Sequence, residues 1–375
     1  MMFNNFIIFF INIFIIYTMS FSTVSSVGST SLGIVGYKQK SNASNASDGR
    51  TYTFTNIRNF VSNPFDTSNK PPGILCISNN STIVCYVYSG GTTKLCKSTD
   101  DGINFSQVTA SPSIFTEKYP LAISGDGNTI FIHDPNLGCL VYSTNGGNSF
   151  NKSTFASSPQ VIRNSPDLSS RYIIITNRGG DGYIYVASNN GATISSVPNM
   201  GSRRWWDVAI SNDGTKIFGI CDDGNIYYSI DSGTTINQMK DDNGNVATFY
   251  TGNINACIYL SNDSSKFIAI VPYMSGYTNS GKVYIWTEGS FSNNATVSYS
   301  STAITYIYDC AISSDNNCYA FSTTQGLYYS TAGYSWKQAT FPSLSSPYNI
   351  RWIWFRGNYL YAYNQSYGIL YKGTY

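Results

Sequence analysis

The hydrophobic and polar positions of this chain repeat in short segments along most of its length. Runs of about five residues rich in Val, Ile, Tyr and Phe alternate apolar and polar side chains, which is the pattern of half-buried β-strands. Polar turns separate these runs, and two kinds of turn alternate along the chain. The first kind is Ser-Gly-Asp-Gly at 124–127 and Ser-Asn-Asp-Gly at 211–214. The pattern therefore predicts many short strands joined by tight turns.

The second kind of turn recurs about every 45 residues, which indicates a repeat architecture. Its clearest copies are at 98–105, 143–150 and 229–236, weaker ones are at 187–194 and 329–336, and a degenerate one is at 286–291. An Asp or Asn side chain in such a turn can accept hydrogen bonds from backbone N–H groups, and Gly adopts the positive φ that the turn needs. We expect this structural role for Asp100, Gly102, Asn145, Gly147, Asn189, Gly191, Asp231, Gly233 and Gly333.

Two turns in each period imply three strands, and the run after the second turn adds a fourth. Repeats of about 40 to 50 residues with four short strands are typical of a β-propeller, in which each blade buries its faces against its neighbours. The turn resembles the Asp-box or BNR repeat, Ser-x-Asp-x-Gly-x-Thr-Trp/Phe, of the sialidase superfamily and of sortilin-like and photosystem-assembly propellers. The resemblance covers residues 45–375 and implies an architecture, because the box is a structural turn.

We expect an all-β, seven-bladed β-propeller of four-stranded blades. Six blades are placed near 73–109, 118–155, 163–197, 205–239, 255–298 and 308–340, and a seventh begins at Asn349. The chain ends before a fourth strand of that blade, so an N-terminal strand at 52–57, preceded by a box-like sequence at 45–52, is expected to complete it. Such closure removes an open sheet edge. Six and eight blades are the alternatives, because the fifth period is stretched to about 55 residues.

The N-terminal segment has the pattern of a targeting sequence. An apolar run at 6–17, with no Lys or Arg before it, is followed by small residues up to position 26. This predicts a signal peptide at 1–26, with an uncleaved signal anchor as the alternative, then a linker at 27–44 and a single propeller domain at 45–375. Nine Asn-x-Ser/Thr sequences agree with secretion. We expect a secreted, glycosylated, monomeric protein that meets a membrane only if the anchor is retained.

Composition narrows the classes of partner. Charged residues make up 11% of the chain and the net charge is +2, against about 25% charged residues in an average domain. Neither nucleic acid nor a polybasic membrane contact is therefore expected. The eight cysteines lack metal-ligand spacing, so we expect no metal and no cofactor. Disulfides Cys76–Cys85 and Cys310–Cys318 are an alternative to eight buried thiols, because each pair flanks a hairpin turn at nearly mirror positions.

The propeller resemblance implies that function gathers around the central channel, on the face where the innermost strands begin. Aromatic and charged residues alternate at these positions. Aromatic rings stack on sugar rings, and Arg matches carboxylate or sulfate oxygens. We predict a ligand site here, either for a glycan, which includes acidic glycans, or for an extracellular protein. Packing of the aromatic rings between blades is the structural alternative. The candidates are Lys118, Tyr119, Arg163, Arg203, Arg204, Trp205, Trp206, Asp207, Tyr308, Asp309, Arg351 and Trp352.

Two further sequence features have plain structural interpretations. His133 has no cluster of Cys, His or carboxylates beside it, and we expect a solvated loop residue. The acidic segment 240–245 suggests a calcium loop, but position twelve counted from Asp241 is Gly252 instead of Glu, so an ordinary turn is expected.

The resemblance to sialidases also implies a hydrolase with an Arg triad, a Tyr–Glu pair and an Asp. The chain matches that pattern poorly, because it has no Phe/Tyr-Arg-Ile-Pro motif and only two Glu. A second hydrolase hypothesis pairs Asp134 with Asp222 or Asp309. We favour a non-catalytic binding propeller, with a glycoside hydrolase and a structural or assembly role as alternatives. If the chain is a sialidase-like enzyme, its catalytic residues would be Glu117, Tyr119, Tyr308, Arg163, Arg178 and Arg351.

Overall fold

The computed structural model describes residues 51–59, 74–89, 92–109, 120–134, 137–155, 159–167, 172–176, 182–246, 248, 256–273, 275, 280–288, 296–301, 304–331, 333, 335–342 and 349–375. Residues 45–375 form one compact unit. The predicted signal peptide and linker lie outside the described residues. Within the described residues, no helix is long and apolar enough to cross a membrane.

The described residues form four-stranded antiparallel sheets, seven in number. Six sheets are each built from four consecutive strands, and the remaining one combines the two ends of the chain. The first three blades contain β2 (Leu75–Ile77), β3 (Ile83–Ser89), β4 (Thr92–Ser98) and β5 (Ser106–Gln107); β6 (Leu121–Ile123), β7 (Ile130–Asp134), β8 (Cys139–Ser143) and β9 (Asn151–Lys152); and β10 (Pro159–Asn164), β11 (Tyr172–Thr176), β12 (Ile184–Ser188) and β13 (Thr193–Ser196).

The next three blades follow the same order. They contain β14 (Trp205–Ile210), β15 (Ile217–Cys221), β16 (Ile226–Ser229) and β17 (Asn237–Gln238); β18 (Cys257–Leu260), β19 (Lys266–Val271), β20 (Lys282–Thr287) and β21 (Thr296–Ser300); and β22 (Ile307–Ile312), β23 (Tyr319–Thr323), β24 (Gly326–Ser330) and β25 (Trp336–Gln338). The composite sheet contains β26 (Ile350–Arg356), β27 (Tyr359–Asn364), β28 (Ile369–Thr374) and β1 (Thr53–Asn59). Two short 3-10 helices, η2 (Asn189–Gly191) and η3 (Pro198–Met200), flank β13.

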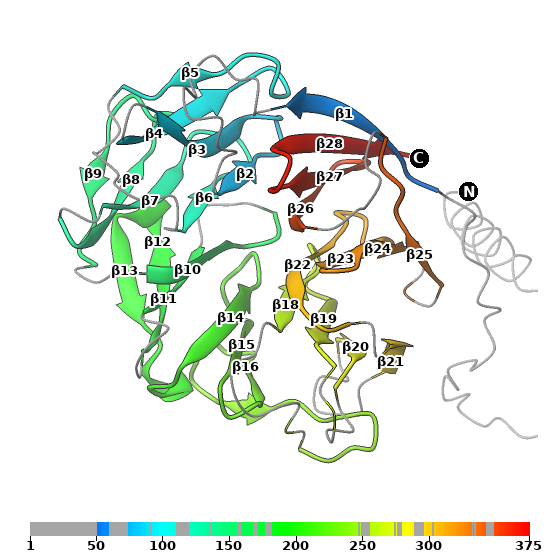
Figure 1. Ribbon diagram of the computed structural model, residues 1–375. Coiled ribbons are helices and arrows are strands. Elements are labelled where there is room, and N and C mark those ends of the chain that lie inside the picture. Colours follow the sequence, from blue (N-terminus) through cyan, green and yellow to red (C-terminus); the bar gives the residue numbers. More distant parts are fainter. Residues whose placement is uncertain are drawn as a thin grey trace, which may run out of the picture. The chain divides into compact units, whose positions relative to one another are not determined.

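The sheets stand around a common axis with the first strand of each blade innermost (Figure 1). The inner strands β2, β6, β10, β14, β18, β22 and β26 follow one another around this axis, and successive ones are in contact from β2 to β26. The prediction of an all-β propeller with four-stranded blades is thus confirmed. Apolar side chains of neighbouring blades pack face to face, as in the stack of Phe218 on Phe267 with ring centroids 4.3 Å apart. Each blade therefore depends on its neighbours for its core.

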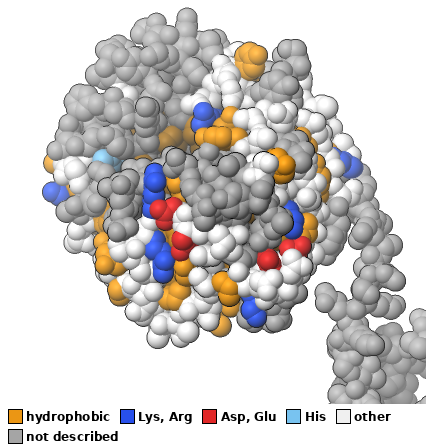
Figure 2. All heavy atoms as spheres, turned by 60° about the horizontal axis from the view of Figure 1, so that its bottom comes forward, with side chains coloured by type: hydrophobic (Ala, Val, Ile, Leu, Met, Phe, Trp, Pro, Cys, Tyr) orange, Lys and Arg blue, Asp and Glu red, His pale blue; other side chains and the backbone are white. Residues whose placement is uncertain are grey.

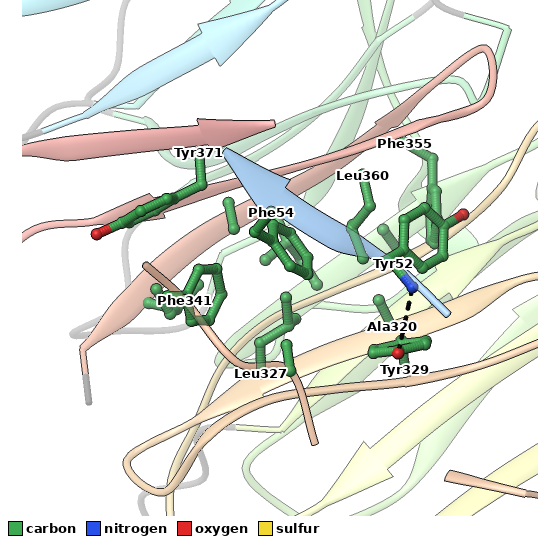
Figure 3. Packing of buried hydrophobic residues seen from close by; sticks show 14 of the residues in the cluster. Tyr52, Phe54, Ala320, Leu327, Tyr329, Phe341, Phe355, Leu360 and Tyr371 are labelled. Atoms are coloured by element: carbon green, nitrogen blue, oxygen red, sulfur yellow. Dashed lines mark hydrogen bonds between the residues drawn. The ribbon is translucent and has the colours of Figure 1, made fainter. Parts of the chain in front are cut away.

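The composite sheet closes the ring by joining the ends of the described domain. β1 pairs with β28 from Thr53 opposite Thr374 to Asn59 opposite Ile369, with an irregularity between Asn56 and Arg58. Figure 3 shows how this strand packs against the sixth blade. Tyr52 and Phe54 are buried there, and the Phe54 ring lies 4.6 Å from that of Phe341. The Tyr52 backbone N–H also donates to the Tyr329 hydroxyl at 3.3 Å.

The turn after the third strand of a blade owes its shape to two side chains and a glycine. In the fourth blade, Ser229 Oγ donates to Asp231 Oδ1 at 2.8 Å and accepts from the Gly233 N–H at 2.8 Å. Asp231 Oδ1 also accepts from the Thr235 N–H at 2.8 Å. Gly233 has φ 87°, and a Cβ there would lie 2.2 Å from Val197 Cγ1. The same bonds form in the first two blades, from Ser98 to Asp100 and from Ser143 to Asn145.

The turns after the first strand link one blade to the next. Asn80 Nδ2 donates to the Asp126 carbonyl at 2.8 Å, and Asn212 Nδ2 donates to the Asn262 carbonyl at 2.6 Å. The Asn262 N–H in turn donates to Asn316 Oδ1 at 3.1 Å. Both kinds of turn lie at the same end of the blades, which we call the turn face. The opposite end, where the inner strands begin, is the loop face.

One prediction about local structure is wrong, and one alternative does not hold. His133 is not a solvated loop residue, because β7 continues through it and buries it at 1% exposure. Burial lowers the pKa of its imidazole. Cys76 and Cys85 do not face each other either, because Cys85 lies opposite Leu75, so the two side chains point to opposite faces of the sheet. The segment that resembled a calcium loop is an ordinary turn, in which Asp241 Oδ1 accepts from the Asn243 and Asn245 N–H groups.

Candidate functional site

A cavity of about 240 Å³ lies between the inner strands. Strands β2, β6, β10, β18, β22 and β26 contribute to its wall. On β26 the lining residues Trp352, Trp354 and Arg356 alternate, because side chains two positions apart in a strand point to the same side. The first two blades contribute apolar side chains, among them Ile74 and Pro120, whereas the later blades contribute charged and aromatic ones, among them Arg163, Asp309 and Trp352. The wall is therefore chemically uneven around the ring.

Arg163 occupies the polar side of this wall and binds two aspartates from other blades. Its Nε lies 2.9 Å from Asp207 Oδ1 and its Nη2 lies 3.2 Å from Asp207 Oδ2, so the contact is bidentate. Its Nη1 lies 3.3 Å from Asp309 Oδ1. The guanidinium from β10 thus joins carboxylates from β14 and β22 across the axis.

Both carboxylates also bind the backbone of the neighbouring inner strand. Asp207 Oδ2 accepts from the Ile258 N–H at 3.0 Å, and Asp309 Oδ2 accepts from the Ile353 N–H at 3.1 Å. A register irregularity immediately before each aspartate turns its side chain into the channel. Each aspartate therefore ties its own inner strand to the next one, as well as binding Arg163.

Burial sets the charge of this network. Burial raises the pKa of Asp309 to about 6, although Arg163 acts in the opposite direction. Burial alone would lower the pKa of Arg163, but the two carboxylates hold it well above its ordinary value. A second guanidinium of the wall, that of the half-buried Arg356, donates to the Ile77 carbonyl at 2.7 Å. Arg163 is thus bonded to two carboxylates, whereas the Arg356 guanidinium is bonded to the Ile77 and Phe355 carbonyls.

The structure moves several predicted ligand residues away from the rim. Trp205 is 1% exposed and packs edge to face on Tyr227 at 6.0 Å, so it belongs to the core. Asp207 and Asp309 are buried and bind Arg163, which is half-buried and lies near the end of β10 instead of before its start. Trp352 is half-buried and stacks on Tyr363 at 5.8 Å.

Two candidates remain together on the loop face, beside the cavity. Arg351 lies over the ring of Tyr308, with Cζ 4.7 Å from its centroid. The Tyr306 ring lies 5.0 Å from that of Tyr308 and is 38% exposed. The Tyr308 hydroxyl donates to Asn349 Oδ1 at 2.8 Å, and Asn349 Nδ2 donates to Ser366 Oγ at 2.6 Å. We call these five residues the Tyr308 cluster.

A second group of candidates lies on the fourth blade. Arg203 Cζ is 4.1 Å from the centroid of the Tyr227 ring, and Arg203 Nη1 is 3.3 Å from Asp223 Oδ2. Arg204 lies over Trp206 at 5.0 Å. These cations are half-buried and already in contact with aromatic rings. On the face shown in Figure 2, acidic side chains lie next to basic ones in small groups, and uncharged surface separates these groups.

Sequence reasoning missed Tyr306, Asn349 and the pairing of Arg163 with its two aspartates. Tyr306 carried a usable signal, because it precedes Tyr308 by two positions and therefore shares its side of the chain. Four named candidates lie outside the described residues: Glu117, Lys118, Tyr119 and Arg178.

The geometry gives little support to the hydrolase hypotheses. Arg163 is held by carboxylates of its own chain, and Arg351 lies on Tyr308. Glu288 lies on the turn face, where it pairs with Lys216. Asp309 is bound by Arg163, whereas Asp134 accepts a hydrogen bond from the Leu137 N–H at 3.1 Å.

Comparison with known proteins supports the fold. No family model matches the chain, and no curated protein matches it in sequence. Among solved structures, YCF48 bound to a D1 peptide aligns with TM-score 0.58 and 14% identity over 88% of this chain and 97% of that one. A catalytically inactive virginiamycin B lyase from Staphylococcus aureus with quinupristin aligns with TM-score 0.59 and 14% identity, over 87% of this chain and 100% of that one. The Cps50 (Swd1) propeller of Myceliophteria thermophila aligns with TM-score 0.57 and 10% identity, over 85% of this chain and 99% of that one. The chain is thus a β-propeller, and its resemblance to Asp-box proteins rests on the turns alone.

Proposed function

We propose that this chain is a secreted, non-catalytic propeller that binds a protein partner through the loop face, with the Tyr308 cluster as the centre of contact. The observation that carries the proposal is the contact of the Tyr308 ring with Tyr306 on one side and with Arg351 beside the channel cavity. Tyr and Arg are the side chains most enriched at energetically important interface positions, together with Trp. Asn349 adds an amide held in place by Tyr308 and Ser366.

The size and the polar groups of the cavity favour a side chain of a partner protein as its occupant. Its volume of about 240 Å³ is below the range of about 300 to 1,000 Å³ that is typical of sites for whole small molecules. The two guanidinium groups of its wall are already bonded within the chain, that of Arg163 to Asp207 and Asp309 and that of Arg356 to the Ile77 carbonyl. A neutral side chain of a partner segment therefore fits better than an acidic sugar. One similar structure, YCF48, is bound to a peptide.

A glycan is the second candidate, because Tyr306 exposes 38% of its surface at the loop face. An exposed aromatic ring can stack on the apolar face of a sugar. In this alternative, the ligand lies over Tyr306 and the channel stays empty.

The test compares two tyrosine–cation pairs on opposite faces. The mature glycosylated chain is used to select peptides from a displayed random library and is also applied to a glycan array. Tyr308→Ala should weaken binding of the selected peptides by about 10- to 30-fold, the loss expected for an interface hot spot. Tyr359→Ala is the matched control, because Tyr359 is 40% exposed on the turn face and Lys372 lies over it at 4.0 Å.

The outcomes separate the candidates. Peptide binding that is lost in Tyr308→Ala and retained in Tyr359→Ala supports the proposal. Binding to glycans alone, lost on Tyr306→Ala, would replace the protein partner with a glycan. Equal binding by all variants would remove the Tyr308 cluster from the ligand site.

A further inference from the structure

Two buried cysteines meet where the fifth and sixth blades adjoin at the channel. Cys257 is the first residue of β18, and Cys310 lies within β22, the neighbouring inner strand. Their Sγ atoms are 2.7 Å apart, against about 2.0 Å in a covalent disulfide. We infer that Cys257 and Cys310 form a disulfide between the two blades when the chain folds in an oxidising compartment.

The surroundings of the pair favour the bond over two separate thiols. Cys257 is 3% exposed and Cys310 is 1% exposed. The Cys257 sulfur also lies 4.0 Å from both Arg163 Nη2 and Asp309 Oδ1, at the edge of the channel network. Two other cysteines have much closer oxygen acceptors: Cys76 Sγ donates to the Leu121 carbonyl at 2.9 Å and Cys221 Sγ to Asp223 Oδ1 at 3.0 Å.

The chemistry needs an oxidant, which is the disulfide of a small thiol or of a folding catalyst. One cysteine thiolate attacks this disulfide, forms a mixed disulfide and releases the first thiol of the oxidant. The second cysteine thiolate attacks the mixed disulfide and releases the second thiol. Two S–H bonds are thus exchanged for one S–S bond, and the oxidant gains the two electrons and the two protons.

Folding decides when this exchange can occur. Burial raises the pKa of both thiols, and thiolate is the reactive form. We therefore expect the bond to form before the fifth and sixth blades close against each other, and to resist reductants afterwards. The link closes a loop between residues 53 positions apart. It stabilises the ring mainly by restricting the unfolded chain.

The test uses the full chain produced in a eukaryotic secretory pathway and purified without reductant. The protein is denatured, alkylated and digested before its peptides are identified by mass spectrometry. Cleavage before Asp309 and Asp315 separates Cys310 from Cys318, so the partner of Cys257 is identified without ambiguity. We expect a linked pair of peptides that carries Cys257 and Cys310 and separates on reduction.

Cys76 is the internal control, because its thiol binds a carbonyl and should be alkylated in the unreduced sample. Alkylation of both Cys257 and Cys310 in that sample would overturn the proposal, and so would a link from either residue to another cysteine.

A second measurement does not depend on the folding of any one variant. Reduction of the denatured wild-type protein before refolding should lower its Tm by about 5 °C, as expected for the loss of one internal disulfide. Cys257→Ser, Cys310→Ser and the double variant should refold to equal Tm values that reductant does not change. A Tm of wild type that is insensitive to prior reduction would contradict the link.

Discussion

On the turn face the same hydrogen bonds recur in blade after blade, whereas the salt bridges of the channel wall all come from one arginine in the described part of the chain. Ser229 and Asp231 repeat the geometry of Ser143 and Asn145 two blades earlier. The salt bridges of Arg163, by contrast, have no counterpart among the other described inner strands. An element that every blade needs recurs with the period of the blades. A side chain that serves the ring as a whole, or a ligand, has no reason to recur.

This difference separates architecture from candidate function. The repeated turns hold strands together locally, and they would do so in any propeller of this kind. The channel wall differs between its two sides, because β2 and β6 present apolar side chains while β10, β14 and β22 carry the charged network. The Tyr308 cluster lies at the loop-face end of this uneven wall. We therefore look for function in the features that break the repeat.

The largest effect is expected from the removal of the channel cation. Arg163→Met leaves Asp207 and Asp309 buried without their partner. Breaking a buried ion pair costs about 3 to 5 kcal/mol, and we expect about 2 to 4 kcal/mol because the Arg163 side chain is 30% exposed. Urea unfolding at neutral pH measures this loss. Arg203→Met is the matched control: it loses a half-exposed pair with Asp223 and should cost below about 1 kcal/mol.

The pH dependence of Arg163→Met identifies the cause of its instability. Burial already raises the pKa of Asp309 to about 6 in the wild type, and Arg163 acts against this rise, so removal of the cation raises the folded-state pKa of Asp309 further above its value in the unfolded chain. The folded state then binds more protons, so the stability of the variant should increase as the pH falls from 7 towards 5. If the variant lost stability through packing alone, the difference in unfolding free energy between variant and wild type would not change with pH. Equal losses in the Arg163 and Arg203 variants would remove the special role of the channel wall.

A smaller effect is expected at a repeated turn. Gly233 has φ 87°, and an added Cβ would meet Val197 Cγ1 at 2.2 Å. Gly138 also has a positive φ, 58°, but a Cβ there meets nothing within 4 Å. We expect Gly233→Ala to cost about 2 to 3 kcal/mol from backbone strain and overpacking, and Gly138→Ala about 1 kcal/mol from strain alone. Thermal unfolding of both variants measures the difference. Similar losses of stability in the two variants would mean that close packing against the Gly233 turn contributes nothing to the cost of the substitution.

The same contrast explains which parts of the molecule the sequence predicted. The turns depend on Ser, Asp and Gly within five residues, so their spacing was visible. The pairs of Arg163 join residues 44 and 146 positions apart, and only closure of the ring brings them together. Trp205 and Trp206 looked equivalent, but the irregularity before Asp207 and the alternation of the strand bury only Trp205.

The N-terminal strand was predictable for a different reason. A blade with three strands has an open edge, and the only uncommitted strand pattern lay at the other end of the chain. His133 was misplaced because it was assigned to the loop after the second strand of its blade, whereas that strand, β7, extends through Asp134. Length of a strand is thus harder to predict than its presence. The contact of Cys257 with Cys310 had no sequence signal, because it too depends on the placement of neighbouring blades.

The smallest expected effects test whether the turn aspartates are only structural. Ser229 is fully buried and accepts the Gly233 N–H, so Ser229→Ala should cost about 1 to 2 kcal/mol by leaving that donor unpaired. Asp231→Asn should leave the Tm unchanged, because Asn145 makes the equivalent bond to the Ser149 N–H at 2.9 Å. Neither change should alter ligand binding at the loop face. If Asp231→Asn abolished binding or activity while the Tm stayed the same, a repeated turn would carry function, and the separation of repeated from unique features would fail.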